Sequence, residues 1–293
     1  MKSKSESFGQ DPANVPAVLA EMTVLAQEQP DLRWAALIDS AFDYPSAEQT
    51  AYSNHARNCY DSAAYDGLEK AAPMLVPIDP INDQAFLVPL LKHCNGRPMI
   101  SFLASHIEVE ELLESWRPLH WISAVDHQRM ILRLADTRTL AALPNVLTPT
   151  QWAAISGHLA RWVIINRTGT LTSLPLPEPN TLKASAIHLD QNQLSALLNV
   201  AEPDNILSLL SESMSEILPE EMSGSERHIM VSKSCDLARK FEIKNWPDLV
   251  SLSVAAFLTK GLTTRDEKLA DYLTRKQWSP GDLGVSLVSE GFV

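Results

Sequence analysis

The chain has 293 residues, of which 45% are hydrophobic and 20% are charged, as in globular proteins large enough to bury a core without disulfides or metals. It carries 36 acidic residues against 24 basic ones, and the net charge of −12 repels phosphate backbones, so nucleic acid is not an expected partner. The three cysteines, Cys59, Cys94 and Cys235, are far apart and form no paired motif, so neither a zinc site nor a disulfide framework is predicted.

The first residues contain no apolar core of the kind that a secretory signal needs. No later stretch approaches the roughly 18 apolar residues that span a bilayer. We therefore expect a cytoplasmic protein without a membrane partner.

The chain begins with a polar segment, residues 1–30, that has room for one short helix over residues 15–29 before Pro30 ends it. Strand-like and helix-like segments then alternate, which predicts an α/β domain with a mixed sheet over residues 31–177. The expected strands are 32–39, 74–77, 99–103, 129–134, 161–166 and 171–174, and the expected helices are 83–92, 107–116, 137–143 and 149–159.

Three prolines within residues 174–179 predict a stiff linker. Beyond it no strand pattern is present, and residues 178–293 are expected to form an all-α C-terminal lobe. Its helices are predicted at 190–199, 204–218, 225–241, 246–260 and 264–275.

Familiar catalytic and cofactor motifs are missing from the sequence. The eight histidines show no metal-ligand spacing, and no nucleophile elbow, phosphate loop or dinucleotide fingerprint occurs. Ser101 or Ser105 beside His106 can be drawn as a nucleophile and base, but that spacing has no specificity. The glutamates of residues 108–114 are typical of a solvated helix face. We expect no metal, no cofactor and no catalytic residue, and therefore a protein that is not an enzyme.

The segment 132–140 combines apolar and charged residues in an unusual way. Arg133 lies inside an otherwise apolar predicted strand, where an unpaired guanidinium would be destabilising. Asp136 stands where that strand becomes a helix and can cap it, and Arg138 follows in the first turn. Two interpretations stay open: a charged clamp that fixes the junction, or a polar recognition site on the edge of the domain.

Four short motifs follow one another along residues 32–175. Their residues are Trp34, Ala35, Leu37, Ile38 and Asp39, then Pro73, Leu75 and Val76, then Leu132, Arg133, Asp136, Arg138 and Leu140, and finally Leu159, Trp162 and Ile165. In this order they resemble the adaptor family known as domain of unknown function 4123, found beside the spike genes of bacterial type VI secretion systems. Thr137 departs from the resemblance by standing where the family usually has proline.

The resemblance implies an adaptor, or chaperone, that binds a cognate toxic effector and the VgrG spike protein and loads one onto the other. It leads us to expect the spike on the α/β domain and the effector on the helical lobe. Two alternatives are a hydrolase whose catalytic set is assembled from distant residues, and a regulatory protein whose helical lobe binds nucleic acid.

Apolar residues near the end of the chain are candidates for partner contact. Val250, Val254, Phe257 and Leu258 form a helical stripe, and an apolar tail follows over residues 283–293. Either set can be the core of the lobe or a docking surface, and Phe257, Leu287 and Phe292 are the residues we single out.

Overall fold

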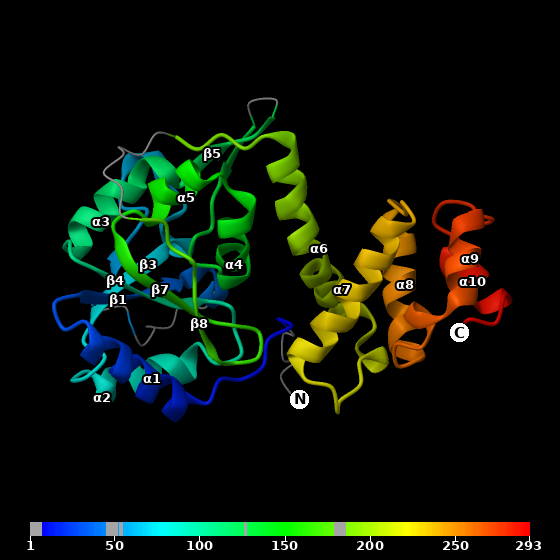
Figure 1. The fold of residues 1–293 in the computed structure, drawn as a ribbon, viewed down its shortest axis with the longest axis horizontal. Coiled ribbons are helices and arrows are strands. Elements are labelled where there is room, and N and C mark those ends of the chain that lie inside the picture. Colours follow the sequence, from blue (N-terminus) through cyan, green and yellow to red (C-terminus); the bar gives the residue numbers. More distant parts are fainter. Residues whose placement is uncertain (1–7, 45–51, 53–54, 126–127, 179–185) are drawn as a thin grey trace. The chain divides into compact units, whose positions relative to one another are not determined.

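The computed structural model describes residues 8–44, 52, 55–125, 128–178 and 186–293, which form two compact units (Figure 1). Residues 12–200 belong to a unit with a β-sheet, and residues 8–11 with 201–293 belong to a helical unit. The predicted fold class, an α/β part followed by an all-α part, is confirmed. None of the described helices combines the length and the apolar composition needed to cross a membrane.

The main sheet has six strands in the order β2-β3-β1-β4-β7-β8, and its neighbouring strands are all antiparallel. It is therefore simpler than the mixed sheet expected from the sequence. A separate antiparallel pair, β5 and β6, stands apart from it. The strands are β1 (Arg33–Asp39), β2 (Arg57–Asn58), β3 (Pro73–Ile78), β4 (Ile100–Ser105), β5 (Trp121–Ser123), β6 (Arg129–Ile131), β7 (Leu159–Ile165) and β8 (Leu171–Ser173).

Helices cover both faces of the sheet because side chains alternate between the faces along each strand (Figure 1). In the central strand β1, Trp34, Ala36 and Ile38 pack in the core that includes α1 and α2. Ala35 and Leu37 pack in the core that includes α3, α4 and α5. These helices are α1 (Val15–Glu28), α2 (Gln84–His93), α3 (Val109–Trp116), α4 (Thr137–Val146) and α5 (Pro149–Ser156).

The strand predicted at 129–134 is shorter than expected. It ends at Ile131, because the backbone then turns: Leu134 N donates to Leu132 O at 3.0 Å and Asp136 N to Arg133 O at 3.3 Å. Arg133 therefore lies in the turn before α4 and not inside a strand, which corrects the sequence interpretation.

Prolines mark the side of β3 that faces away from β1. Cys59 N donates to Pro73 O at 2.9 Å, so the Pro73 carbonyl points toward β2. Hydrogen-bonding direction alternates along a strand, so Pro77 faces the same way. Within the residues that the structure describes, β2 pairs with Met74 and Leu75. The edge of β3 beyond it thus presents the Pro77 carbonyl and, because proline has no N–H, no donor at that position.

The boundary between the two units falls between Val200 and Ala201, inside α6 (Gln191–Ser213), and not near residue 177 as the sequence suggested. The expected linker does not act as one over its described part, since Trp152 Nε1 donates to Pro175 O at 2.8 Å. Its last residue, Pro179, lies outside the described residues. The start of α6 belongs to the sheet unit, where Gln193 Nε2 donates to Val146 O at 3.0 Å.

Helix α6 also joins the two helices predicted at 190–199 and 204–218. Pro203, which lies between the two predicted ranges, stands inside the continuous helix. Proline removes one N–H donor but has a φ compatible with a helix. The helical unit continues with α7 (Gly224–Lys240), α8 (Trp246–Leu258), α9 (Glu267–Arg275) and α10 (Leu283–Ser289). The sequence did not predict α10. It is held by the buried Asp248 of α8, whose carboxylate accepts from Gly281 N at 3.1 Å and Leu283 N at 3.0 Å.

The residues just before the sheet unit are bound to the start of α7. The carboxylate of Asp11 accepts from Ser225 N at 2.9 Å and from Ser225 Oγ at 2.6 Å. Burial disfavours the charged form of Asp11, but the hydrogen bonds from Ser225 prevail and lower its pKa. The backbone of Gln10 lies so close to Gly224 that a Cβ there would stand 2.7 Å from Gln10 O.

Gly224→Ala is therefore expected to destabilise the protein by about 1–3 kcal/mol, because an added methyl group would meet backbone atoms that must shift. The measurement is urea unfolding of the full chain. Gly284→Ala is the control, since the nearest atom that its Cβ would meet is the side-chain oxygen Ser251 Oγ, at 2.8 Å, and not a backbone atom. Equal losses in the two variants would contradict the close backbone contact.

Candidate functional site

The carboxyl end of β1 carries a cluster of charged residues. Asp39, the last residue of β1, has a side chain only 3% exposed, and its carboxylate accepts from Arg133 Nη2 at 2.6 Å. The same carboxylate accepts from Ala41 N at 3.1 Å and so caps the short 3-10 helix η1 (Ser40–Asp43). The contact with Arg133 joins residues 94 positions apart in the chain.

Asp136 is the second buried carboxylate of this cluster. It accepts from Nε and Nη2 of Arg138 at 3.0 and 2.7 Å, and from Arg138 N at 3.1 Å, so it caps α4 and holds a guanidinium in a bidentate pair. Arg133 Nη1 lies 3.6 Å from the same carboxylate. The guanidinium of Arg133 thus bridges Asp39 and Asp136. We call Asp39, Arg133, Asp136 and Arg138 the charged clamp.

The clamp combines buried carboxylates with a guanidinium that reaches solvent. The side chain of Arg133 is 44% exposed, whereas that of Asp136 is 4% exposed. Burial raises the pKa of the Asp39 carboxyl above its ordinary value, although the charge of Arg133 acts to lower it. Arg133 therefore neutralises a buried acid on one side and presents N–H groups to solvent on the other.

Phe42 is a member of the site that the sequence did not identify. The guanidinium carbons of Arg133 and Arg138 each lie 5.5 Å from the centre of its ring. Both distances are within the range of cation–π attraction. The single turn of η1 brings Phe42 under the clamp, and no motif in the sequence signals this.

A second polar cluster follows at Asp43, the last residue of η1. Its carboxylate lies 3.0 Å from His93 Nε2, and it accepts from Tyr52 Oη at 2.6 Å and from Arg97 Nη1 at 2.9 Å. Burial disfavours the charged form of Asp43, but the hydrogen bonds from His93 and Tyr52 prevail and hold its pKa at about 2. His93 and Arg97 are neighbours in sequence, but Asp43 and Tyr52 come from other segments, so spacing alone could not have assembled the cluster.

The other residues considered for chemistry have structural partners. Ser105 Oγ donates to His158 O at 2.6 Å and accepts from Ile107 N, and Ser101 Oγ accepts from Trp162 Nε1 at 3.1 Å. No group of three or more metal-binding side chains is placed to hold an ion in the part of the chain that the structure describes.

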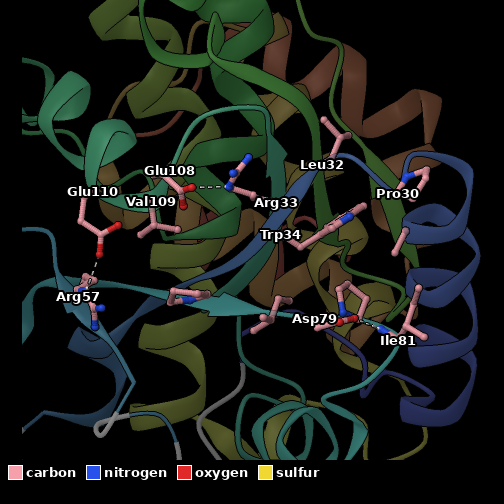
Figure 2. Close-up of a pocket in the computed structure, with 14 residues that line it drawn as sticks. Pro30, Leu32, Arg33, Trp34, Arg57, Asp79, Ile81, Glu108, Val109 and Glu110 are labelled. Carbon is pink, nitrogen blue, oxygen red and sulfur yellow. Dashed lines mark hydrogen bonds and ion pairs between the residues drawn. The ribbon is translucent and has the colours of Figure 1, made fainter.

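Trp34, at the opposite end of β1 from Asp39, lies in the wall of a pocket of about 480 Å³ (Figure 2). Its indole Nε1 is buried and has no hydrogen-bond partner among the described residues. Two ion pairs stand at one end of the pocket, Arg33 with Glu108 at 2.7 Å and Arg57 with Glu110 at 3.0 Å. Trp34 and the clamp are therefore separate features at the two ends of one strand.

The candidate contact residues of the helical unit lie differently from the expectation. Phe257 is 3% exposed and Leu287 is 1% exposed, and both belong to the core of this unit. Phe292 is partly buried, with its ring centre 5.5 Å from that of Tyr272. The tail forms α10, which buries Leu283 and Leu287, so of the two interpretations left open Phe257 and Leu287 fit the core of this unit.

Comparison with known proteins gives one match. No curated protein and no solved structure matches the chain. The matching family model starts at Trp34 in β1 and ends within α5, so it includes all four residues of the charged clamp. Residues 34–154 match the family described as "Domain of unknown function (DUF4123)".

Proposed function

We propose that this protein is a bacterial type VI secretion adaptor, a cytoplasmic chaperone that binds a cognate effector and loads it onto the VgrG spike protein. The observation that carries the proposal is the charged clamp, which lies inside the DUF4123 match and includes Arg133, Asp136 and Arg138 of the matching segment 132–140. A guanidinium held by buried carboxylates is fixed in position before binding, and a fixed donor set favours specific recognition of a partner protein.

In this proposal the sheet unit binds the spike and the helical unit binds the effector. Exposed aliphatic side chains support a contact surface on the helical unit. Leu262 is 70% exposed and Val285 is 75% exposed, and Leu258 and Val288 are also exposed. We place the contact with the effector at these exposed apolar side chains. No chemical step is assigned to the protein.

The test is co-expression of the full chain with its effector and spike protein, followed by affinity purification of each pair. We expect stable complexes with the parent protein. Val285→Asp combined with Val288→Asp should lose the effector and keep the spike. Arg133→Lys keeps a positive charge near Asp39 but lacks the two-pronged donor geometry, and it should weaken the spike complex selectively.

Val24→Asp is the matched control, because Val24 is also an exposed valine, on α1 of the sheet unit. It should leave both complexes intact. Recovery of neither partner with the parent protein would reject the adaptor function. Loss of the spike with the Val285 and Val288 changes would reverse the assignment of the two units.

A further inference from the structure

The pocket beside Trp34 has two chemically different ends. Figure 2 shows the two arginine–glutamate pairs at one end and Pro30, Leu32 and Ile81 at the other, where Asp79 accepts from Ile81 N at 2.9 Å. Trp34, Ile78 and Pro80 add further apolar surface to the lining of the pocket. A ligand that fits must therefore combine an apolar group with a polar or charged one.

The ion pairs of the pocket can exchange their partners at little cost. The side chains of Arg33 and Arg57 are each 50% exposed, and those of Glu108 and Glu110 are each 63% exposed. Exposed pairs of this kind are weakly coupled, so a ligand charge can replace one member. The pocket is lined by the acids Asp79, Glu108 and Glu110 against Arg33 and Arg57, so acidic groups are in excess. The net charge of −12 attracts a basic ligand over a longer range.

The backbone beside the pocket also selects for hydrogen-bond donors. Pro77 lines the pocket, and its carbonyl faces away from β1 beyond the end of β2. The N–H of Asp79, the next residue that faces this way, already donates to Asp83 Oδ2 at 2.7 Å. A segment bound here can donate to the edge of β3 but finds no free donor at these two positions.

From these three features we infer that the pocket binds a short basic segment of a partner polypeptide. An aliphatic side chain of that segment enters between Pro30, Trp34 and Ile81. A flanking lysine or arginine pairs with Glu108 or Glu110, and a backbone N–H donates to Pro77 O. The inference rests on the proposed function only in taking the ligand to be part of a partner protein.

The test uses blocked pentapeptides as probes, titrated into the full ¹⁵N-labelled chain. The three peptides are acetyl-Ala-Lys-Leu-Lys-Ala-amide, its serine analogue with serine in place of leucine, and its glutamate analogue with glutamates in place of the lysines. The readout is the indole N–H signal of Trp34, assigned from its loss in Trp34→Phe. The lysine–leucine peptide should shift this signal saturably, and the other two should not.

Glu108→Gln with Glu110→Gln should weaken binding of that peptide roughly fivefold, as expected for the loss of two exposed charge pairs. Ile81→Asp should abolish it. Glu220→Gln with Glu221→Gln makes the same charge change at exposed positions of the helical unit and should leave the affinity unchanged.

Three results would overturn the inference: no shift with the lysine–leucine peptide, equal shifts with the glutamate analogue, or unchanged affinity in the Glu108 and Glu110 variant. The adaptor function is judged separately by co-purification. If the peptide does not bind but both complexes still form, the pocket assignment is rejected and the adaptor function stands. Peptide binding without either complex rejects the adaptor function and leaves the pocket assigned.

Discussion

Arg133→Ala is expected to destabilise the folded protein by about 3–5 kcal/mol at neutral pH, because it leaves the buried Asp39 carboxylate without its cation. The measurement is urea unfolding followed by circular dichroism. Acidification should restore part of the loss in this variant. A carboxyl whose pKa is raised in the folded state destabilises the protein at pH above that pKa, and the penalty shrinks as the carboxyl takes up a proton.

Arg117→Ala is a matched control for this prediction. The side chain of Arg117 is 48% exposed, close to the 44% of Arg133, but its partner Glu114 is 62% exposed. We expect a loss of no more than about 1 kcal/mol in the control. Adding Asp39→Asn to Arg133→Ala should recover stability, because the main penalty comes from the unpaired buried charge. Equal losses at Arg133 and Arg117 would argue against the clamp and favour a recognition role for Arg133.

Lowering the pH from 6.5 to 4 is expected to remove about 3 kcal/mol of stability through His120 alone. Burial lowers the pKa of His120 to about 4, so the folded protein keeps this side chain neutral while the unfolded chain binds a proton. The stabilisation that comes from keeping His120 neutral is full above pH 6.5. It decreases as the pH falls from 6.5 to 4 and no longer changes below about 4. The measurement is the free energy of unfolding as a function of pH.

His120→Phe isolates this effect, because the difference between variant and parent cancels the other titrating groups. Phenylalanine also keeps an aromatic edge against Tyr60 and Tyr65, whose ring centres lie 5.2 and 5.9 Å from that of His120. The variant should lose much less stability between pH 6.5 and 4. His106→Phe, at an exposed position, should follow the parent. If His120→Phe keeps the pH profile of the parent, the loss of stability between pH 6.5 and 4 has another cause.

Local sequence patterns predicted most of the helices and strands because each depends on neighbouring residues. The continuous apolar run of β1 and the helical spacing of α3 are visible in any short window. Errors arose where distant contacts decide. The strand ending at Ile131 was extended to residue 134 because residues 132–135 remain apolar apart from Arg133. These apolar residues are buried because they pack in the core beside α4 and α5, whereas the strand itself ends at Ile131.

The clamp was partly predictable for the same reason. Asp136 and Arg138 are close in sequence, so a helix cap and an ion pair between them could be inferred from spacing. The partner of Arg133 could not, because Asp39 lies 94 residues away and meets it only through the tertiary fold. His120 was one histidine among eight, and the sequence carries no sign that both of its nitrogens are buried.

The helical tail shows how a missed element changes an inference about surfaces. An apolar chain end suggested docking, but Asp248 caps the chain near Leu283 and lets α10 form. Once the tail is helical, Leu283 and Leu287 point to the core while Val285 and Val288 point to solvent. The surface proposed for the effector therefore uses Val285 and Val288 of this tail in place of the buried Leu287.

The prolines on the outer side of β3 have a further consequence for the behaviour of the protein at high concentration. Open sheet edges are templates on which copies of a chain aggregate through intermolecular strand pairing. Here the edge strands β2 and β8 span only Arg57–Asn58 and Leu171–Ser173. Beyond β2, Pro77 interrupts the ladder that a second chain would need. This fold is therefore expected to resist fibril growth from its own sheet even when its partners are absent.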